Sequence, residues 1–147
     1  DYSKAVDLVT KAALKEMKKL YLDVDGVLVS KGKATEGIAE FLRFATENFD
    51  CYWLTTHCYG DTAPVNRYLA SRIPGEALVY VESFKATQWE LWKTEAIDFS
   101  SPFVWIDDNL FEMERRALVE HTALESFIHI NLLSNPAQLL DVMKSLS

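Results

Sequence analysis

Short apolar runs alternate with amphipathic segments along nearly the whole sequence, and this alternation restricts the fold more than any other feature. The apolar runs predict strands at residues 20–24, 51–55, 77–81, 103–107 and 127–131. Helical spacing of apolar residues predicts helices at residues 3–19, 36–48, 63–72, 85–97, 110–122 and 136–146. Strands that alternate with helices form a parallel sheet covered on both faces. We therefore expect an α/β protein, a three-layer α/β/α sandwich with a five-stranded parallel sheet, as a single domain over residues 1–147.

Polar side chains follow three of the predicted strands. They are Asp23 and Asp25, Thr55 and Thr56, and Asp107 and Asp108. Right-handed crossover connections bring the carboxyl ends of parallel strands to one edge of the sheet, where open α/β sheets bind their ligands. Lys93 lies in the predicted helix that leads into the fourth strand. We therefore expect these side chains to form one site.

Acidic residues dominate this predicted site, and their chemistry narrows its function. Carboxylates that share a cleft repel one another, so their pKa values rise unless a cation is bound. An all-oxygen ligand set suits Mg²⁺, which binds a few carboxylates together with water and phosphate oxygens. A carboxylate can attack phosphorus, a second carboxylic acid can protonate the leaving group, and a hydroxyl and a lysine can hold phosphate oxygens. The pattern therefore favours phosphoryl chemistry, and Gly26 leaves room for a ligand beside it.

Four segments of the chain resemble, in the same order, the four motifs of the haloacid dehalogenase superfamily. The first is Asp23-Val24-Asp25-Gly26-Val27, and the second is Trp53-Leu54-Thr55 at the end of an apolar strand. The third is Lys93-Thr94-Glu95-Ala96-Ile97, upstream of the fourth strand, and the fourth is Trp105-Ile106-Asp107-Asp108. The resemblance covers nearly the whole chain from residue 20 onward, and it implies the strand order 5-4-1-2-3.

The resemblance implies a phosphomonoester hydrolase that works through an aspartyl-phosphate. Asp23 would be the nucleophile, and Asp25 would be the general acid and base. Thr55 would bind the phosphoryl group, and Lys93 would neutralise the charge of the nucleophile and the phosphate. These roles predict a phosphorylated substrate, either a small molecule or a macromolecule.

The resemblance also implies Mg²⁺ as the cofactor. Its ligands would be Asp23, the backbone carbonyl of Asp25, Asp107 and Asp108, the last directly or through water. The segments between the motifs are too short for a sizeable cap domain, so the chain resembles the capless members of the superfamily. Such members have an open site, and many act on macromolecules or rely on a partner to cover the site.

Three contacts with substrate remain open from the sequence alone. Thr56 is an alternative to Thr55, because strand ends are uncertain by a residue or two. Lys85 is an alternative to Lys93, although the spacing to the fourth strand favours Lys93. His57 lies just beyond the second strand, where it either contacts substrate or packs within its own loop.

Other functional classes fit less well. The segment after Asp23 is not a calcium-binding loop, because apolar residues stand at positions that such a loop fills with ligands or glycine. Phosphorylation receivers share the acidic pair and the lysine, but in them the lysine follows the fifth strand, whereas here an acidic pair ends the fourth. Two alternative functions remain. One is a catalytically silent binding or regulatory module with the same fold, and the other is a phosphatase of nucleic-acid ends.

Trp89 and Trp92 lie three residues apart on the predicted helix 85–97. At this spacing they share a face, which either belongs to the core or forms an exposed aromatic patch. An exposed patch could stack bases or dock a partner.

Composition limits the partners and the compartment. The net charge is −7, which argues against non-specific binding of nucleic acids. No apolar run reaches the roughly 18 to 20 residues of a membrane span, and the lysine-rich N-terminal stretch lacks the apolar core of a secretory signal. Cys51 and Cys58 do not form a disulfide framework. We therefore predict a cytoplasmic protein that does not bind membranes, and the sequence predicts no particular oligomeric state.

Overall fold

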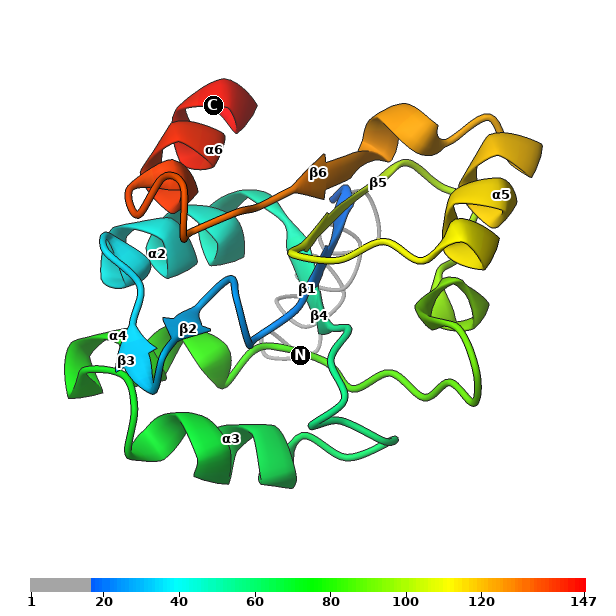
Figure 1. Ribbon diagram of the computed structural model, residues 1–147. Coiled ribbons are helices and arrows are strands. Elements are labelled where there is room, and N and C mark those ends of the chain that lie inside the picture. Colours follow the sequence, from blue (N-terminus) through cyan, green and yellow to red (C-terminus); the bar gives the residue numbers. More distant parts are fainter. Residues whose placement is uncertain (1–16) are drawn as a thin grey trace, which may run out of the picture.

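A four-stranded parallel sheet is the centre of the computed structural model, which describes residues 17–147 (Figure 1). Its strands are β4 (Asp50–Trp53), β1 (Lys19–Leu22), β5 (Phe103–Asp107) and β6 (Phe127–His129), in this spatial order. The predicted helix over residues 3–19 falls outside the described part of the chain except for its last three residues. Those three are not helical, since Lys19 already begins β1.

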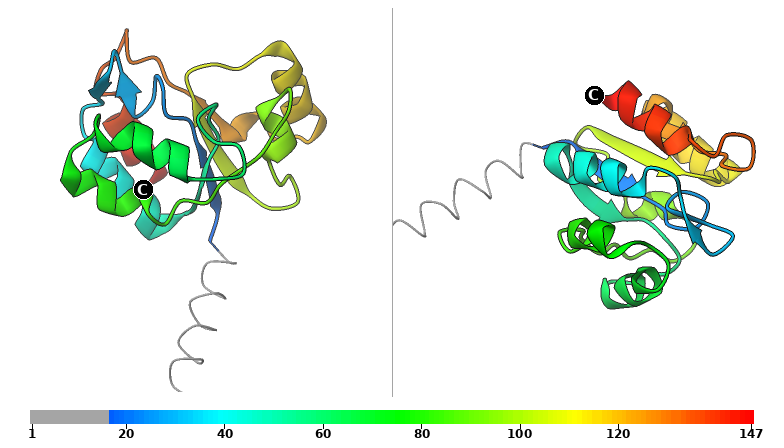
Figure 2. Two further views of the ribbon diagram at one scale, coloured as in Figure 1. Left: turned by 90° about the horizontal axis from the view of Figure 1, so that it is seen from below. Right: turned by 90° about the vertical axis from the view of Figure 1, so that its left-hand side faces the viewer.

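Helices cover both faces of the sheet (Figures 1 and 2). One face carries α2 (Ile38–Asn48), α4 (Gly75–Val81) and α6 (Gln138–Leu146), and α3 (Ala63–Ala70) lies beside α4. The other face carries α5 (Glu112–Glu120) and two short 3-10 helices, η1 (Lys93–Ala96) and η2 (Leu124–Ser126). A small hairpin, β2 (Val29–Ser30) with β3 (Lys33–Ala34), is the only insertion between β1 and α2. Within residues 17–147, no helix combines the length and the apolar character that crossing a membrane requires.

The strands alternate their side chains between two apolar cores, as the two-residue period of a strand requires. Leu22 and Ile106 point into the larger core under α2, α4 and α6. Tyr21 and Trp105 point into the smaller core on the side of α5 and η1. Because all four are buried, the strand segments read as nearly continuous apolar runs, and this is why the sequence identifies them. Cys51 and Cys58 are buried free thiols.

The sheet has four strands and not the predicted five. The segment 77–81 is part of helix α4, in which Ala77 and Val81 are buried one helical turn apart. Pro74 stands at the start of this helix, and its carbonyl accepts the first helical hydrogen bonds from Ala77 and Leu78. A short apolar run fits a buried helix as well as a buried strand, so periodicity alone could not separate the two. Counted from β6 through β5 and β1 to β4, the observed order is the one expected for the predicted strands 5, 4, 1 and 2.

The place of the missing strand is taken by a single residue. Lys85 forms an isolated parallel bridge with Tyr52, its N–H donating to the carbonyl of Cys51 and its carbonyl accepting from the N–H of Trp53. The predicted helix 85–97 is therefore wrong over most of its length, because the first residue bonds to the sheet edge. Only η1, at its end, is helical.

Candidate active site

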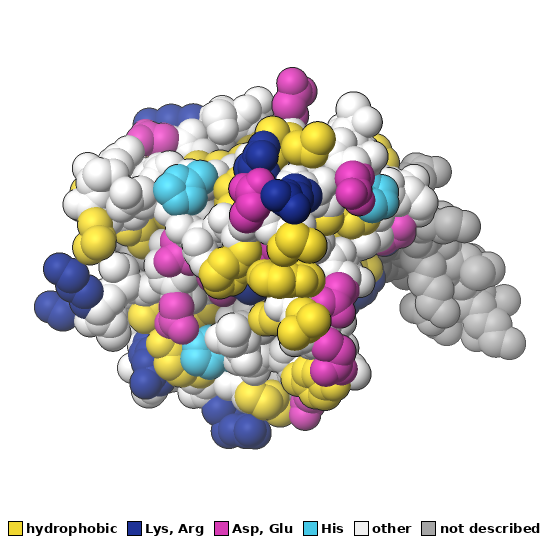
Figure 3. Space-filling view, turned by 45° about the vertical axis from the view of Figure 1, so that its right-hand side comes forward, with side chains coloured by type: hydrophobic (Ala, Val, Ile, Leu, Met, Phe, Trp, Pro, Cys, Tyr) yellow, Lys and Arg dark blue, Asp and Glu magenta, His cyan; other side chains and the backbone are white. Residues whose placement is uncertain are grey.

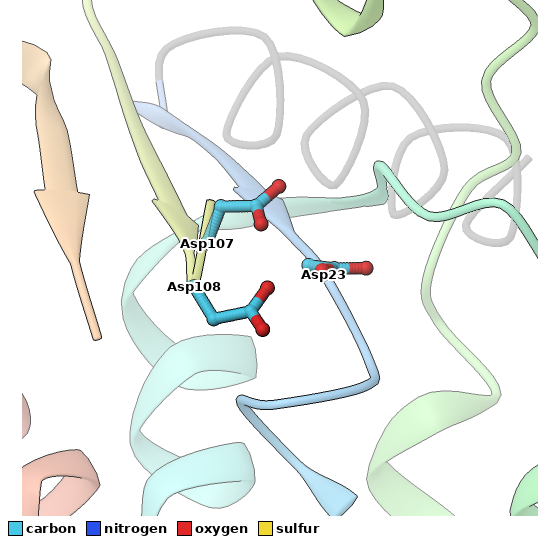
Figure 4. Close-up of side chains that lie close together, drawn as sticks. All are labelled: Asp23, Asp107 and Asp108. Carbon is cyan, nitrogen blue, oxygen red and sulfur yellow. The ribbon is translucent and has the colours of Figure 1, made fainter. Parts of the chain in front are cut away.

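Three aspartates meet at the carboxyl edge of the sheet, as the sequence predicts (Figure 4). Leu22 of β1 pairs in register with Ile106 of β5, so Asp23 and Asp107 occupy equivalent positions at the ends of neighbouring strands. One carboxylate oxygen from each of Asp23, Asp107 and Asp108 lies within 4.8 Å of the others. Asp23 and Asp107 are buried, whereas Asp108 is exposed. The register of two parallel strands therefore brings together acids that lie far apart in the sequence.

A tight turn after β1 fixes the orientation of Asp23. The N–H groups of Val27, Leu28 and Val29 all donate to the carbonyl of Val24, at 3.2, 2.8 and 3.1 Å. The N–H of Val24 donates to Oδ1 of Asp23 at 2.8 Å, which leaves Oδ2 turned toward Lys93. The nucleophile predicted from the sequence is therefore held by backbone hydrogen bonds on a strand end.

Gly26 occupies a position in this turn that no other residue fits. Its φ angle is +81°, a left-handed conformation that side chains disfavour. A Cβ atom at this position would collide with the carboxylate of Asp108. The glycine therefore allows the turn after β1 to approach the acid at the end of β5.

Lys93 joins the acidic cluster from the other side. Its Nζ lies 2.7 Å from Oδ2 of Asp107 and 3.4 Å from Oδ2 of Asp23. Lys85, the alternative considered from the sequence, instead pairs with Asp50 at 3.0 Å, at the start of β4. Of the two lysines, only Lys93 contacts the cluster.

Glu114 holds Lys93 in place, and sequence reasoning missed this residue. Although charged, Glu114 is buried. Its Oε2 accepts the backbone N–H of Lys93 at 2.9 Å, and its Oε1 accepts that of Phe111 at 3.0 Å. One buried carboxylate on α5 therefore positions η1, which carries the lysine. The sequence signal was its position. Glu114 lies three residues after Phe111, which directly precedes α5, and a glutamate at that spacing is typical of a helix N-terminus.

The cluster shifts the protonation of its members. Burial, followed by the charge of Asp107, raises the pKa of Asp23 to about 8. Burial and the neighbouring Asp107 also raise the pKa of Asp108. Burial lowers the pKa of Lys93, but the negative charges of Asp23 and Asp107 outweigh it, and the net shift is upward. One lysine therefore does not neutralise three acids, and the site retains an attraction for a cation.

The donor set fits a hard divalent cation such as Mg²⁺. All three converging groups offer carboxylate oxygens, and a bound cation would offset the burial and the repulsion that raise the pKa of Asp23. Asp25 does not belong to this group of converging carboxylates. This is compatible with its predicted role, in which its backbone carbonyl, and not its side chain, contacts the metal.

The side chain of Asp25 is bound by two residues that follow β4. Tyr68 on α3 donates its hydroxyl to Oδ1 at 2.6 Å, and Nε2 of His57 lies 2.7 Å from Oδ2. The rings of His57 and Tyr68 stack with centroids 4.0 Å apart, and the guanidinium of Arg72 lies over the Tyr68 ring at 3.9 Å. Burial raises the pKa of Asp25, but the hydrogen bonds of Tyr68 and His57 and the charges of His57 and Arg72 lower it overall.

His57 is thus placed beside an acid of the site, while Tyr68 is a second residue that sequence reasoning missed. Tyr68 lies on a helix 43 positions from Asp25 along the chain, and no local motif marks it. The two threonines that follow β4 differ. Thr55 is buried and its Oγ1 accepts the N–H of His57 at 3.3 Å, whereas Thr56 lines the cavity next to Asp23.

Two cavities adjoin the acidic cluster. The first, of about 300 Å³, contains Asp23, Lys93, Asp107 and Asp108, and its remaining lining residues are Thr56, Trp89, Leu91, Asn109, Phe111 and Glu114. The second, of about 410 Å³, lies on the far side of Asp108. It is lined by Asp25, Gly26 and the β2–β3 hairpin, together with residues 129–133. Only the first cavity reaches the predicted nucleophile and the lysine.

Trp89 and Trp92 do not share a helix face, because the segment that carries them is not helical. Trp89 packs against the smaller core and lines the first cavity. Trp92 is half-buried, with its ring centroid 5.8 Å from that of Phe111.

The chain matches no protein-family model, and comparison with curated proteins and with solved structures found no similar protein.

Proposed function

We propose that this protein is a Mg²⁺-dependent phosphomonoester hydrolase that works through an aspartyl-phosphate on Asp23. The observation that carries the proposal is the convergence of Asp23, Asp107, Asp108 and Lys93 at the carboxyl edge of the sheet. The resemblance of the four motifs to the haloacid dehalogenase superfamily, in its capless form, supports the same assignment. The small β2–β3 hairpin is in keeping with a site that no cap covers.

The metal would be held by Asp23, Asp107, Asp108 and the backbone carbonyl of Asp25. When bound, it supplies positive charge that draws the phosphate toward the nucleophile and offsets the charge that develops on its oxygens. Lys93 adds a second positive charge at the same place, because its Nζ already lies 3.4 Å from Oδ2 of Asp23. Thr56, which lines the cavity, is positioned for a hydrogen bond to the phosphate, with Thr55 supporting its loop.

The reaction consists of two displacements at phosphorus. In the first, a carboxylate oxygen of Asp23 forms a bond to phosphorus while the bond between phosphorus and the alcohol oxygen breaks, and Asp25 gives its proton to the departing oxygen. In the second, Asp25 takes a proton from a water molecule whose oxygen bonds to phosphorus. The bond between Asp23 and phosphorus then breaks, which releases phosphate and restores both carboxyl groups.

The test is hydrolysis of a panel of alkyl and aryl phosphate monoesters in the presence of Mg²⁺, comparing the wild type with Asp23→Asn. We expect Asp23→Asn to lower kcat by at least about a thousandfold, since a carboxamide does not attack phosphorus as a carboxylate does. Asp141→Asn, which changes an exposed acid on α6, should leave kcat unchanged. Acid-quenched wild-type reactions should contain a protein species heavier by one phosphoryl group.

Two results would contradict the proposal. Equal turnover in the wild type and in Asp23→Asn would remove Asp23 from the chemistry. No turnover of any monoester with Mg²⁺ or other divalent cations, in a folded protein, would favour the catalytically silent binding module instead.

A further inference from the structure

The cavity that contains Asp23 and Lys93 has one apolar wall. Trp89, Leu91 and Phe111 are the apolar side chains of its lining and make up this wall. The side chain of Leu91 is 75% exposed and that of Phe111 is 54% exposed. Figure 3 shows hydrophobic side chains gathered in a patch on this side of the molecule, with acidic and basic side chains around it. Exposed apolar side chains that adjoin a polar site mark a surface that a ligand covers.

Carboxylates hold the segment that carries Leu91 in one conformation. Glu95 accepts the backbone N–H groups of Glu90, Leu91 and Trp92 at 3.3, 3.0 and 2.6 Å. In addition, Glu90 accepts the hydroxyl of Tyr59 at 2.7 Å. The loop between the sheet edge and η1 is therefore ordered by side-chain acceptors, although it has no regular secondary structure.

Phe111, which belongs to the same wall, is also held by a carboxylate. Its backbone N–H donates to the buried Glu114, and its ring lies against that of Trp92. The apolar wall is thus formed before a ligand arrives, which lowers the entropy cost of binding.

The size of the cavity limits what the wall can hold. About 300 Å³ is at the lower end of the range for small-molecule sites, and part of this volume lies beside Asp23 and Lys93, where a phosphate would bind. The remaining space is enough for one ring system, and a longer group would extend from it into solvent. A flat ring suits this wall, because indole, phenyl and isobutyl groups pack on the face of an aromatic ring.

We propose that the cavity recognises a phosphate group carried on an aromatic ring, with the phosphate beside Lys93 and the ring against Trp89, Leu91 and Phe111. The assignment of this group as a substrate rests on the proposed hydrolase function, but its recognition does not. The neighbouring cavity lacks this combination, because its lining mixes polar residues with Val29, Ile130 and Leu133 and includes neither Asp23 nor Lys93.

Binding of two non-hydrolysable phosphonates, measured by ligand-observed NMR with Mg²⁺ present, tests the proposal independently of turnover. Benzylphosphonate carries the ring and methylphosphonate lacks it. In the wild type we expect benzylphosphonate to bind at least about tenfold more tightly, since the ring buries apolar surface of both partners. In a double variant, Leu91→Ser with Phe111→Ser, the ratio of the dissociation constants of methylphosphonate and benzylphosphonate should fall below about threefold. The dissociation constant of methylphosphonate itself should not change.

Leu124→Ser is the matched control, because it removes an exposed leucine that lines neither cavity, and it should keep the wild-type ratio. If the double variant does not fold, the same ratio is measured in the single variant Leu91→Ser, which should fold because Leu91 is 75% exposed and contributes little to the core. That variant should lower the ratio at least about twofold. A wild-type ratio near one, or a ratio that the variants leave unchanged, would overturn the proposal.

Parallel assays of monoester hydrolysis separate this inference from the proposed function. Turnover without discrimination between the phosphonates would refute ring recognition and leave the hydrolase. Discrimination without turnover would refute the hydrolase and leave ring recognition. Absence of benzylphosphonate binding would refute ring recognition whatever the turnover, and absence of turnover of every monoester would refute the hydrolase whatever the binding.

The aromatic phosphate has two possible sources, a small molecule or phosphotyrosine in a protein. A short peptide that contains phosphonomethylphenylalanine distinguishes them. Tighter binding of the peptide than of benzylphosphonate indicates phosphotyrosine, and equal or weaker binding indicates a small aryl phosphate. Either result requires the ring to bind and therefore supports the proposal.

Discussion

Asp23 and Asp25 are two residues apart, yet their surroundings shift their pKa values in opposite directions. Asp23 is buried beside Asp107, and its pKa is raised to about 8. The pKa of Asp25 is lowered overall, because hydrogen bonds from Tyr68 and His57 stabilise its carboxylate more than burial destabilises it. In the proposed reaction Asp23 must be ionised to attack and Asp25 must be protonated to assist the leaving group, so both shifts of the metal-free protein are opposite to what these roles require. The reaction therefore depends on a bound cation, which would lower the pKa of Asp23, and on the negative charge of a bound phosphate, which would raise that of Asp25.

Tyr68→Phe tests the role of Asp25 through the pH dependence of kcat. The first displacement requires protonated Asp25, so kcat should decrease as the pH rises through the pKa of Asp25 in the enzyme–substrate complex. Removing the hydroxyl takes away a hydrogen bond that favours the carboxylate, so this pKa rises. We therefore expect the decrease to occur at higher pH in the variant, in which the remaining phenyl ring can still stack on His57.

Tyr80→Phe is the control, since Tyr80 lies on α4 and lines a surface site formed by residues of α2 and α4, none of which belongs to the acidic cluster or contacts Asp25. A pH profile of Tyr68→Phe identical to that of the wild type would show that Asp25 is not the group whose protonation limits the rate.

At the scale of elements, the carboxyl ends of β1 and β5 carry the acids, while η1 and α5 position the lysine between them. Glu114 connects these two helices through the backbone N–H groups of Lys93 and Phe111. A single buried side chain thus sets the distance of Lys93 from Asp107 and also supports the apolar wall at Phe111.

Glu114→Gln should lower the free energy of unfolding by about 1–3 kcal/mol, the usual cost of a buried donor left without an acceptor. The amide has only one acceptor oxygen, so one of the two backbone N–H groups would face an NH₂ group. Urea unfolding measures the change. Glu112→Gln, at an exposed position of the same helix, should change the free energy of unfolding by less than about 0.5 kcal/mol. Equal effects of the two substitutions would contradict the positioning role of Glu114.

At the scale of the whole molecule, the acidic cluster opposes folding unless it binds a cation or a proton. The folded state raises the pKa of Asp23 from 3.8 to about 8 and also raises that of Asp108. Between pH 3.8 and about pH 8 the folded protein therefore binds more protons than the unfolded chain, so the free energy of unfolding decreases as the pH rises. The lowered pKa of Asp25 acts in a different window, below its ordinary value of 3.8.

We therefore expect the Tm of the metal-free protein to decrease from about pH 4 to about pH 8, as measured by differential scanning calorimetry. Mg²⁺ should raise the Tm more at pH 8 than at pH 5, because at the lower pH protons compete for the same carboxylates. Asp23→Asn should weaken both effects. An equal response to Mg²⁺ at the two pH values would argue against metal binding by these acids.

Local sequence determined the parts of this protein that depend on one segment at a time. The apolar runs around Leu22, Trp53 and Ile106 predicted three strands of the sheet, because strands buried on both faces are apolar throughout. The acids and threonines that follow these runs predicted the site, since parallel strands must end at one edge. This is why Asp23, Asp107 and Asp108 could be placed together before their distances were known.

Only the tertiary structure decided the features that depend on contacts between distant segments. The segment 77–81 is a helix because Ala77 and Val81 find an apolar neighbour in the α2 layer, and residues 86–92 are a loop because Lys85 bonds to the edge of β4. Tyr68 reaches Asp25, and Glu114 reaches Lys93, across the fold and not along the chain. The acids of the site follow from where strands end, whereas the residues that orient them follow from how the helices pack.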